Sequence, residues 1–451
     1  MKVYEQICGD IKKDIAKQNI KAGERLPSLL SMSKKYNCSK GSVIKAYQQL
    51  SSQHVIYSKP QSGYYMADNL TREEDYREGF HLDDGNPVVG SFSTVDTHHC
   101  LHIAADMYST YSLNISIRGT PSLNSILHKF LAMENVHAKS ENIYLTQGIT
   151  QILTHLTLSP FPNGKKTILV EAPSSQHYIS FLKQTDVRVL TIKRDEKGVD
   201  LKELETLFKE EDIKFFYIIP RNHNPLGTKL SNHQRKHIME LALKYNVYIV
   251  EDDYFGNAHK LPKYVPIYYF SNQKNCIHLR SMSKVLPLLR IGLALIPDDF
   301  HNTFEEISHQ SYYYSYFMPS LISQATYEVY LKSGIYEKHY SQISGLINTK
   351  LKIVKEIASK WNSEYITLIG AESGYYFSLR LHPDIKVSEL IENLEKKHVY
   401  ITSTKGAFYV TEEYDNSVRL AISKITSEHL IEALNIIYEI VIEMLAVSCN
   451  Q

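Results

Sequence analysis

The chain of 451 residues is poor in cysteine, and its cysteines do not form the pattern of a disulfide framework. The five cysteines are scattered and odd in number, which suits a reducing compartment better than an oxidising one. No apolar stretch approaches the roughly 18–20 residues that a membrane-spanning helix needs. The charged start, MKVYEQICGDIKKD, is followed by no apolar run. We therefore expect a cytoplasmic protein without a signal peptide and without a membrane partner.

The chain also lacks the residue spacing of a metal centre. Its twenty histidines and five cysteines show no ligand spacing, so we predict no metal. The net charge is only +1, but it is unevenly spread. Residues 1–70 hold eleven basic and five acidic residues, a net charge of +6, whereas the remainder holds 39 basic and 44 acidic residues, a net charge of −5. This distribution favours a nucleic-acid-binding module joined to a different body.

The first 68 residues predict a winged helix-turn-helix domain. Val3, Ile7 and Ile11 repeat at the spacing of an amphipathic helix. Ser28 and Ser39 stand where they would cap two further helices. Two β-prone runs then flank Lys-Pro-Gln-Ser-Gly, which is typical of a hairpin turn. The order predicts a recognition helix over 40–52 and a wing tip over 59–63.

The remainder predicts an α/β domain behind a linker. Residues 69–90 are charged and poorly periodic, as in a linker. Short apolar strands then alternate with helical stretches, which indicates a largely parallel sheet over 91–451 with a smaller C-terminal α+β subdomain from about 320 to 451. The expected strands are 142–147, 167–173, 187–192, 214–220, 247–253, 276–283 and 291–297, with 374–381 and 418–422 in the subdomain. Ligands of such sheets bind beyond the carboxyl ends of the strands.

Several polar residues fall at these carboxyl ends, and together they match the needs of pyridoxal 5′-phosphate (PLP). Its aldehyde needs an amine, and its ring nitrogen needs a carboxylate. Its phenolic oxygen needs hydrogen-bond donors, and its phosphate needs an anion-binding site. Lys284 is the candidate amine, and either Asp252 or Asp253 is the candidate carboxylate. The other candidates are Asn224 and Tyr254 for the phenolic oxygen, and Ser281, Arg290 and the amides at Gly148 and Ile149 for the phosphate.

Ordered motifs carry a family resemblance over nearly the whole chain. They are DEKGVDLKELE (195–205), NPLG (224–227), EDDYF (251–255), SMSKVLPLLRIG (281–292) and SVRLAIS (417–423). They resemble fold type I aminotransferases, and the first 66 residues resemble a GntR-type winged helix. In this order they are similar to the MocR/GabR family of transcriptional regulators, which implies the PLP-dependent transferase fold of type I.

The resemblance implies roles for individual residues. Lys284 matches the lysine that forms the Schiff base, Asp252 the partner of the ring nitrogen, and Arg419 the arginine that pairs with an amino-acid carboxylate. It also implies a homodimer, arranged head-to-tail, and a double-stranded DNA operator. The candidate DNA contacts are Ser39, Lys40, Ser42, Lys45, Lys59 and Gly63.

The chain departs from the family pattern at several positions. Ser175 replaces the aromatic residue expected to stack on the cofactor ring, with His177 or Tyr178 as substitutes. Ile149 replaces a hydroxyl near the phosphate, and the interval from Lys284 to Arg290 is one residue shorter than usual. Two further departures are Arg118, in place of a tyrosine that reaches the phosphate, and Leu30, in place of a DNA-binding arginine. These changes weaken the case for turnover more than the case for binding.

Three functions remain open on the sequence. The first is a DNA-binding transcriptional regulator that senses an amino compound, or PLP itself, through a Schiff base on Lys284. The second is an active PLP-dependent aminotransferase with an appended DNA-binding module. A regulator that has lost PLP is a third reading. Sustained transamination would separate the second function from the first.

Overall fold

The structure is a computed structural model, and the chain folds as two units, Met1–Glu78 and Gly79–Gln451. It describes residues 3–16, 20, 23–52, 55–59, 62–66, 79–85, 92–107, 118–256, 258–259, 261, 263–306 and 318–448. Within these ranges no helix is both long enough and apolar enough to cross a bilayer.

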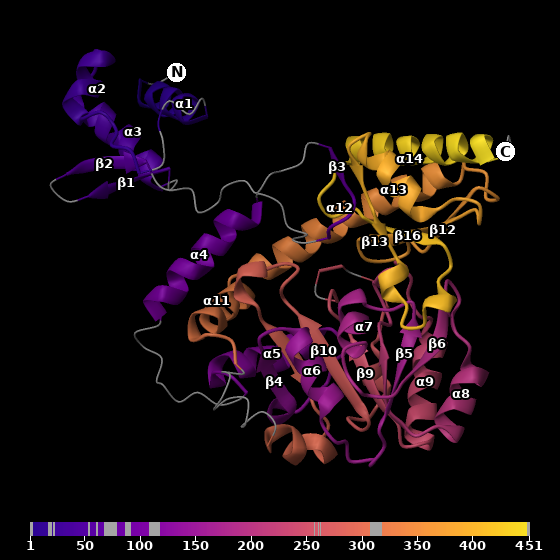
Figure 1. Cartoon of the computed structure of the whole chain (residues 1–451). Coiled ribbons are helices and arrows are strands. Elements are labelled where there is room, and N and C mark those ends of the chain that lie inside the picture. Colours follow the sequence, from indigo (N-terminus) through magenta and orange to yellow (C-terminus); the bar gives the residue numbers. More distant parts are fainter. Residues whose placement is uncertain are drawn as a thin grey trace. The chain divides into compact units, whose positions relative to one another are not determined.

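The first unit has three helices followed by a two-stranded hairpin (Figure 1). They are α1 (Val3–Ala16), α2 (Leu29–Lys35), α3 (Lys40–Ser52), β1 (Ile56–Lys59) and β2 (Gly63–Met66). Ser28 and Ser39 accept hydrogen bonds from the amides of Ser31 and Ser42, so both predicted caps are present. Ile7, Ile11 and Val43 belong to the shared apolar core. The predicted winged helix-turn-helix is confirmed, with α3 over residues 40–52.

The second unit is built around an eight-stranded sheet in the order β4-β11-β10-β9-β8-β5-β6-β7. The strands are β4 (Ile143–Thr146), β5 (Thr167–Ala172), β6 (Val189–Asp195), β7 (Gly198–Val199), β8 (Ile213–Ile218), β9 (Tyr248–Asp252), β10 (Cys276–Ser281) and β11 (Gly292–Leu295). Strands β6, β5, β8, β9 and β10 run parallel, whereas β11 and β7 are antiparallel to their neighbours. The central strands are buried at every residue, as in a sheet covered on both faces.

Helices lie between several of these strands, as the predicted alternation requires, and others precede β4. They are α4 (Phe92–Met107), α5 (Pro121–Met133), α6 (Ile149–Leu158), α7 (Gln176–Leu182), α8 (Leu201–Glu210) and α9 (Asn232–Lys244). Helix α6 packs on β4, β10 and β11, and α9 packs on β9. Short 3₁₀ turns are η2 (Ser140–Asn142), η3 (Ile267–Phe270), η4 (Pro287–Leu289), η5 (Asp298–Phe300), η6 (Lys405–Ala407) and η7 (Thr411–Glu413). The α/β architecture is confirmed.

A smaller antiparallel sheet forms the C-terminal part, with strand order β12-β13-β16-β15. Its strands are β12 (Ile366–Ile369), β13 (Tyr376–Leu381), β15 (Thr402–Ser403) and β16 (Ser417–Ala421). The helices are α11 (Leu321–Lys332), α12 (Ile335–Ala358), α13 (Val387–Glu395) and α14 (Ser427–Ser448). Helix α14 packs on α12 and α13, and α11 packs along α4 (Figure 1). This is the smaller α+β subdomain that the sequence predicts.

One segment differs from the expected linker over 69–90. Residues 79–85 belong to the second unit, where β3 (Phe80–His81) pairs in parallel with β14 (Val399–Tyr400). The reason is apolar burial, because Leu82 is fully buried and Phe80 packs against the core. The rest of the expected linker, 69–78 and 86–90, lies outside the described residues.

Candidate functional site

A cavity of about 370 Å³ lies at the carboxyl ends of β4, β8, β9 and β10. Every residue predicted to bind the cofactor lines it: Gly148, Ile149, Asn224, Asp252, Tyr254, Ser281, Lys284 and Arg290. The parallel strands bring these distant residues to one edge of the sheet. The sequence reasoning missed further lining residues, among them Thr150, Tyr217 and Ser283.

Asp252 ends β9, and its carboxyl group is buried in the wall of the cavity. The hydroxyl of Tyr217 donates a hydrogen bond to Oδ2 at 2.6 Å. The second oxygen, Oδ1, is also buried, and no hydrogen-bond partner for it occurs in the described parts of the chain. Burial raises the pKa of Asp252 to about 7, although the bond from Tyr217 acts in the opposite direction. A buried acceptor oxygen of this kind can accept a hydrogen bond from a donor on a bound molecule.

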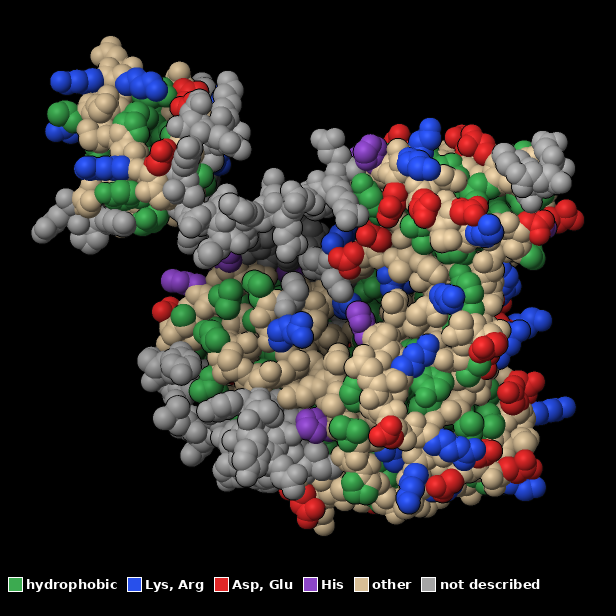
Figure 2. All heavy atoms as spheres, viewed as in Figure 1, with side chains coloured by type: hydrophobic (Ala, Val, Ile, Leu, Met, Phe, Trp, Pro, Cys, Tyr) green, Lys and Arg blue, Asp and Glu red, His purple; other side chains and the backbone are tan. Residues whose placement is uncertain are grey.

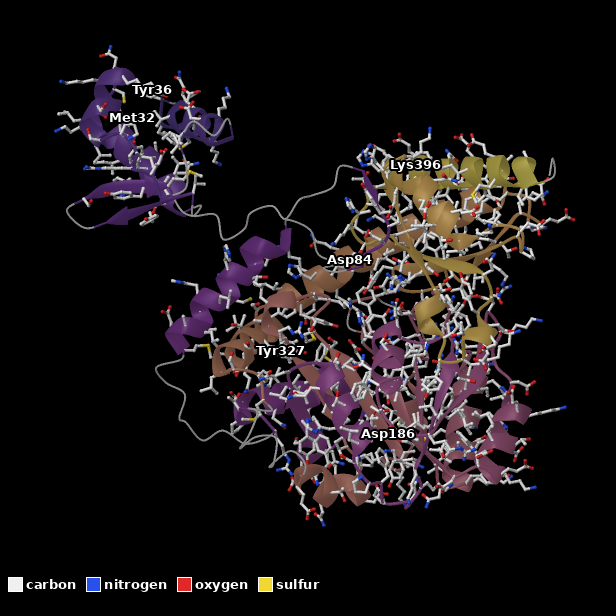
Figure 3. The ribbon with its side chains drawn as sticks, in the orientation of Figure 1. Met32, Tyr36, Asp84, Asp186, Tyr327 and Lys396 are labelled. Carbon is white, nitrogen blue, oxygen red and sulfur yellow. The ribbon has the colours of Figure 1, made fainter. Side chains whose placement is uncertain are left out.

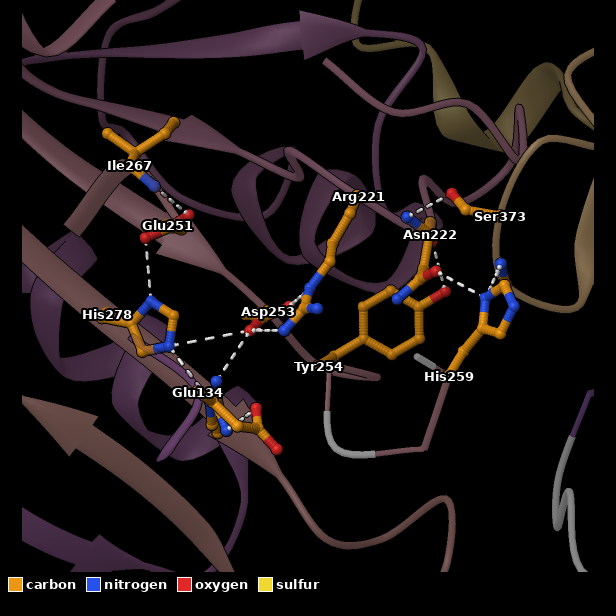
Figure 4. A network of polar contacts seen from close by, with 12 residues as sticks. Glu134, Arg221, Asn222, Glu251, Asp253, Tyr254, His259, Ile267, His278 and Ser373 are labelled. Carbon is orange, nitrogen blue, oxygen red and sulfur yellow. Dashed lines mark hydrogen bonds and ion pairs between the residues drawn. The ribbon is translucent and has the colours of Figure 1, made fainter. Parts of the chain in front are cut away.

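Asp253, the alternative candidate, faces a different environment (Figure 4). Both of its carboxylate oxygens accept hydrogen bonds at 2.6 Å from the guanidinium of Arg221. Arg280 lies 3.4 Å away, and His278 lies 3.7 Å away. Successive side chains of a strand point to opposite faces, which separates the two neighbours. The geometry therefore favours Asp252 over Asp253 as the residue that meets a ligand.

Lys284 follows β10 and presents a largely buried amine to the cavity. Its Nζ lies 6.0 Å from the centre of the Tyr254 ring. Burial lowers the pKa of Lys284 to about 8, with a further lowering from Arg419 and opposite effects from Asp84 and Asp252. A lysine with this pKa is partly in its neutral, nucleophilic form near physiological pH.

The amino end of α6 forms another part of the cavity wall. Gly148 stands just before the helix with φ 108°, a conformation that favours glycine. Backbone amides at a helix start attract anions. Ser281, Ser283 and Arg290 line the same cavity. This set of amides, hydroxyls and a guanidinium can hold a phosphate despite the apolar Ile149.

Tyrosines also line the cavity. The hydroxyl of Tyr178 is 2.8 Å from Oγ1 of Thr157, and its ring centre is 4.6 Å from that of Tyr217. Tyr254 donates a hydrogen bond of 2.7 Å to the carbonyl of Asn222. His177 lines the cavity from an exposed position on α7. Both proposed substitutes for the missing stacking residue therefore reach the cavity.

Two predicted residues do not line the cavity. The guanidinium of Arg419 donates a 2.5 Å hydrogen bond to the carbonyl oxygen of Asp83. Arg118 donates to the carbonyl of Glu141 at 2.8 Å and forms an ion pair with Glu305 in the same chain. The partners of Arg118, like Arg118 itself, do not line the cavity of Lys284.

The candidate DNA contacts belong to the first unit, on which Figure 2 shows projecting Lys and Arg side chains. Ser39 and Ser42 lie 3.1 Å apart at the start of α3, and Lys40 is exposed there. Lys45 is exposed too, but its amine packs 4.5 Å from the ring centre of Tyr4. Gly63 begins β2 on the wing, whereas the side chain of Lys59 lies outside the described part of the structure.

Comparisons with known proteins agree with this geometry. Residues 93–437 match the family model of aminotransferase class I and II, and residues 3–66 match that of bacterial regulatory proteins, gntR family. The chain is 33% identical to "Uncharacterized HTH-type transcriptional regulator YcxD" of Bacillus subtilis (strain 168), over 95% of this chain and 98% of the relative. It is 23% identical to HTH-type transcriptional regulator NorG of Staphylococcus aureus (strain USA300), over 92% of this chain and 98% of that relative.

Solved structures show the same fold for the second unit. The multiple substrate aminotransferase from Thermococcus profundus has a TM-score of 0.73 at 21% identity, covering 84% of this chain and 96% of its own. Pyrococcus horikoshii kynurenine aminotransferase, solved with PMP, has a TM-score of 0.72 at 21% identity, covering 81% of this chain and 91% of its own.

These findings define a winged-helix DNA-binding domain fused to a fold type I aminotransferase domain. The chain belongs to the aminotransferase class I and II family and, within it, to the transcriptional regulators of the MocR/GabR type. The resemblance seen in the sequence is confirmed. Pyridoxal 5′-phosphate is the cofactor of this fold. Oδ1 of Asp252, which has no hydrogen-bond partner within the described ranges, and the half-buried Lys284 fit its ring nitrogen and its aldehyde.

Proposed function

We propose that this protein is a DNA-binding transcriptional regulator that holds PLP on Lys284 and senses an amino compound or PLP itself. The observation that carries the proposal is the pairing of two groups in one cavity. One is the largely buried amine of Lys284, and the other is the buried Oδ1 of Asp252, which lacks a partner among the described residues. An amine and a carboxylate so placed are what a pyridine aldehyde requires.

PLP supplies an aldehyde that condenses with amines and a ring that withdraws electrons when its nitrogen is protonated. The residues of this chain hold and orient it. Asp252 would accept a hydrogen bond from the protonated ring nitrogen, and Tyr254 and Asn224 would contact the phenolic oxygen. Ser281 and Arg290, together with the amides at Gly148 and Ile149, would hold the phosphate.

The regulatory step is a linkage between two sites. An amino compound bound in the cavity beside Lys284 would stabilise one conformation of the second unit, and this conformation would favour or disfavour DNA binding. We propose a cytoplasmic homodimer, arranged head-to-tail as the family resemblance implies. Its two winged helices would bind two half-sites of an operator. The DNA contacts are proposed at Ser39, Lys40, Ser42, Lys45, Lys59 and Gly63.

The experiment is an absorption titration of the purified protein with PLP. We expect a band near the visible edge that is absent in Lys284→Ala and that changes on adding an effector amine. Binding to a double-stranded DNA of the promoter region upstream of its own gene, followed in parallel, should change with the same amine. A protein that gains no band with PLP contradicts the proposal.

An active aminotransferase with an appended DNA-binding module is the second candidate. The pKa of Lys284, lowered by burial to about 8, favours it, because a proton-transferring lysine needs a pKa near the operating pH. The position of Arg419 outside the cavity disfavours it. Incubation with amino acids and a keto acid separates the two candidates, since only the enzyme gives many turnovers per active site.

A further inference from the structure

The cavity that contains Lys284 has two chemically different halves. One, here called the charged half, is formed by β9 and by the segment after β10, which contribute Asp252, Lys284 and Arg290. The other, here called the aromatic half, is formed by α6 and α7 and is lined by Leu153, Ser175, Tyr178 and Phe181, among others. None of the described lining residues on α6 or α7 is an acid, a lysine or an arginine. The proposed contacts to PLP use none of these four side chains, so the aromatic half has no assigned occupant.

Tyr178 joins the two helices that form the aromatic half. Its hydroxyl lies 2.8 Å from Oγ1 of Thr157 on α6, and its ring centre lies 4.6 Å from that of Tyr217 on β8. The residue is buried, with an exposed fraction of 4%. The hydroxyl is therefore used inside the protein, and only the ring of Tyr178 remains to contact a ligand.

Phe181 presents a half-buried ring on the same face of α7. Its ring centre lies 6.4 Å from that of Tyr178, at an interplanar angle of 19°. The buried side chain of Leu153 on α6 lines the same half. Aromatic rings prefer offset or edge-to-face neighbours with centres roughly 4.5–7 Å apart. A ligand ring placed against Phe181 would remove apolar surface from water in a geometry that rings favour.

The room for such a ring is at Ser175. This serine is the N-cap of α7, but its half-buried side chain makes no capping hydrogen bond. Because a serine side chain is short, this end of α7 lines the cavity without filling it. The whole cavity measures about 370 Å³, which lies within the roughly 300–1,000 Å³ of known ligand sites.

We propose that the aromatic half binds an uncharged aromatic ring of an effector while PLP occupies the charged half. This inference rests on the proposed function, because that function places PLP in the charged half. A charged group in the aromatic half would lose its hydration without gaining an ion-pair partner from the described lining residues of α6 and α7. The ring belongs either to the amino compound itself or to a separate molecule, and it is recognised by the same side chains in both cases.

Helix α7 also connects the aromatic half to the smaller C-terminal subdomain. The amide of Ser174, just before the helix, donates to the carbonyl of Ala407 at 2.9 Å. Nζ of Lys183, just after the helix, donates to the carbonyl of Phe408 at 2.9 Å. The turn that follows carries Asp186, which is labelled in Figure 3. A ring bound against α7 thus contacts a helix that is hydrogen-bonded to the subdomain at both ends, which couples ring binding to the placement of that subdomain.

The experiment uses the full-length protein loaded with PLP and three probes. Tryptamine carries an aromatic ring and a primary amine, ethylamine is the same amine without the ring, and indole is the ring alone. Absorbance titrations give the concentration at which each amine changes the PLP band, and saturation-transfer NMR detects bound indole.

We expect at least one of two signals from the wild-type protein. In the first, tryptamine changes the band at about tenfold lower concentration than ethylamine, because its ring is buried. In the second, indole receives saturation from the protein. The first signal alone places the ring on the amino compound, and the second alone places it on a separate molecule.

Two substitutions locate the ring. Ser175→Tyr fills the aromatic half with a ring of the protein itself, so the PLP band should still form and ring binding should disappear. Ser180→Tyr, the same change at an exposed position of α7, is the matched control and should behave as wild type. Phe181→Ala should weaken ring binding several-fold. Phe270→Ala, which removes a half-buried ring of η3 outside the cavity, should leave it unchanged.

Three results overturn the inference and leave the proposed function standing. The first is a wild-type protein that gains the PLP band and gives neither signal. The second is unchanged ring binding in Ser175→Tyr, which would place the ring elsewhere. The third is equal ring binding in Phe181→Ala and Phe270→Ala, which decides the question even if Ser175→Tyr does not fold. If the wild-type protein gains no band with PLP, the proposed function itself fails, and the inference fails with it.

Discussion

The hydroxyl of Tyr217 and the carboxylate of Asp252 are joined by a 2.6 Å hydrogen bond inside the cofactor cavity. Tyr217 lies on β8 and Asp252 ends the neighbouring strand β9, so the sheet fixes the distance between them. The bond uses Oδ2, and the buried Oδ1 has no hydrogen-bond partner among the described residues. Tyr217 is therefore a positioning residue for the proposed cofactor contact.

Removing this hydroxyl should weaken PLP binding. In Tyr217→Phe the pKa of Asp252 should rise above its value of about 7, because the lost bond favours the carboxylate form. Near pH 7 a larger fraction of Asp252 is then protonated, and we expect PLP affinity to fall by about tenfold or more, the value of one hydrogen bond to a charged group. An absorbance titration measures this change. Tyr248→Phe, a buried tyrosine bonded to Asp299, is the matched control.

The same substitution should affect PLP affinity at Asp252 and the stability of the fold at Asp253. Asp252→Asn should reduce PLP affinity by about 10–100-fold with little loss of stability, since burial already disfavours this carboxylate. Asp253→Asn breaks the buried pair with Arg221 and should lower the free energy of unfolding by about 3–5 kcal/mol. Urea unfolding of the PLP-free proteins tests the second effect. Equal PLP affinity of Asp252→Asn and wild type would refute the ring-nitrogen role.

The attachment of PLP should depend on pH through Lys284. Burial lowers the pKa of Lys284 from 10.5 to about 8, so the protonated form dominates below this value and the reactive neutral amine dominates above it. The rate of attachment should therefore rise about tenfold per pH unit below pH 8 and level off above. Stopped-flow absorbance measures the rate. A rise that continues towards pH 10.5 would show an ordinary, solvated lysine.

The two lysines of the recognition helix should contribute unequally to DNA binding. Lys40 is exposed at the start of α3, whereas the amine of Lys45 packs against the ring of Tyr4. On a duplex of random sequence, Lys40→Ala should weaken binding and reduce the salt slope by about one, with a smaller effect for Lys45→Ala. The PLP spectrum should not change in either variant. Unchanged DNA affinity in both would mean that α3 is not the recognition helix.

Much of the fold could be predicted from the sequence, because local patterns determine it. A helix occupies 40–52 as expected, and the apolar run 167–173 contains β5 (Thr167–Ala172). Residues 79–85 resemble a linker in sequence, because the two aspartates after Leu82 mask its burial in the second unit. The order of strands across the sheet depends on contacts between distant segments, and no local pattern contains it.

The sequence predicts which residues line the candidate site, but it does not predict the hydrogen bonds between them. Strand ends placed Lys284 and Asp252 at one edge of the sheet, since ligands of such sheets bind there. The sequence does not determine whether Asp252 or Asp253 faces the cavity, because this depends on which elements pack against each face of the strand. Tyr217 was missed, because a tyrosine in a buried strand carries no signal of its own. The acceptor for Arg419 is a backbone carbonyl 336 residues earlier in the chain, which side-chain patterns do not reveal.

The most direct test of the central claim is borohydride reduction of the protein incubated with PLP, followed by mass spectrometry of its peptides. Reduction fixes the cofactor to the amine that holds it. We predict that the phosphopyridoxyl group appears on Lys284 and disappears in Lys284→Ala. Its absence from Lys284 in the reduced wild-type protein would contradict the account.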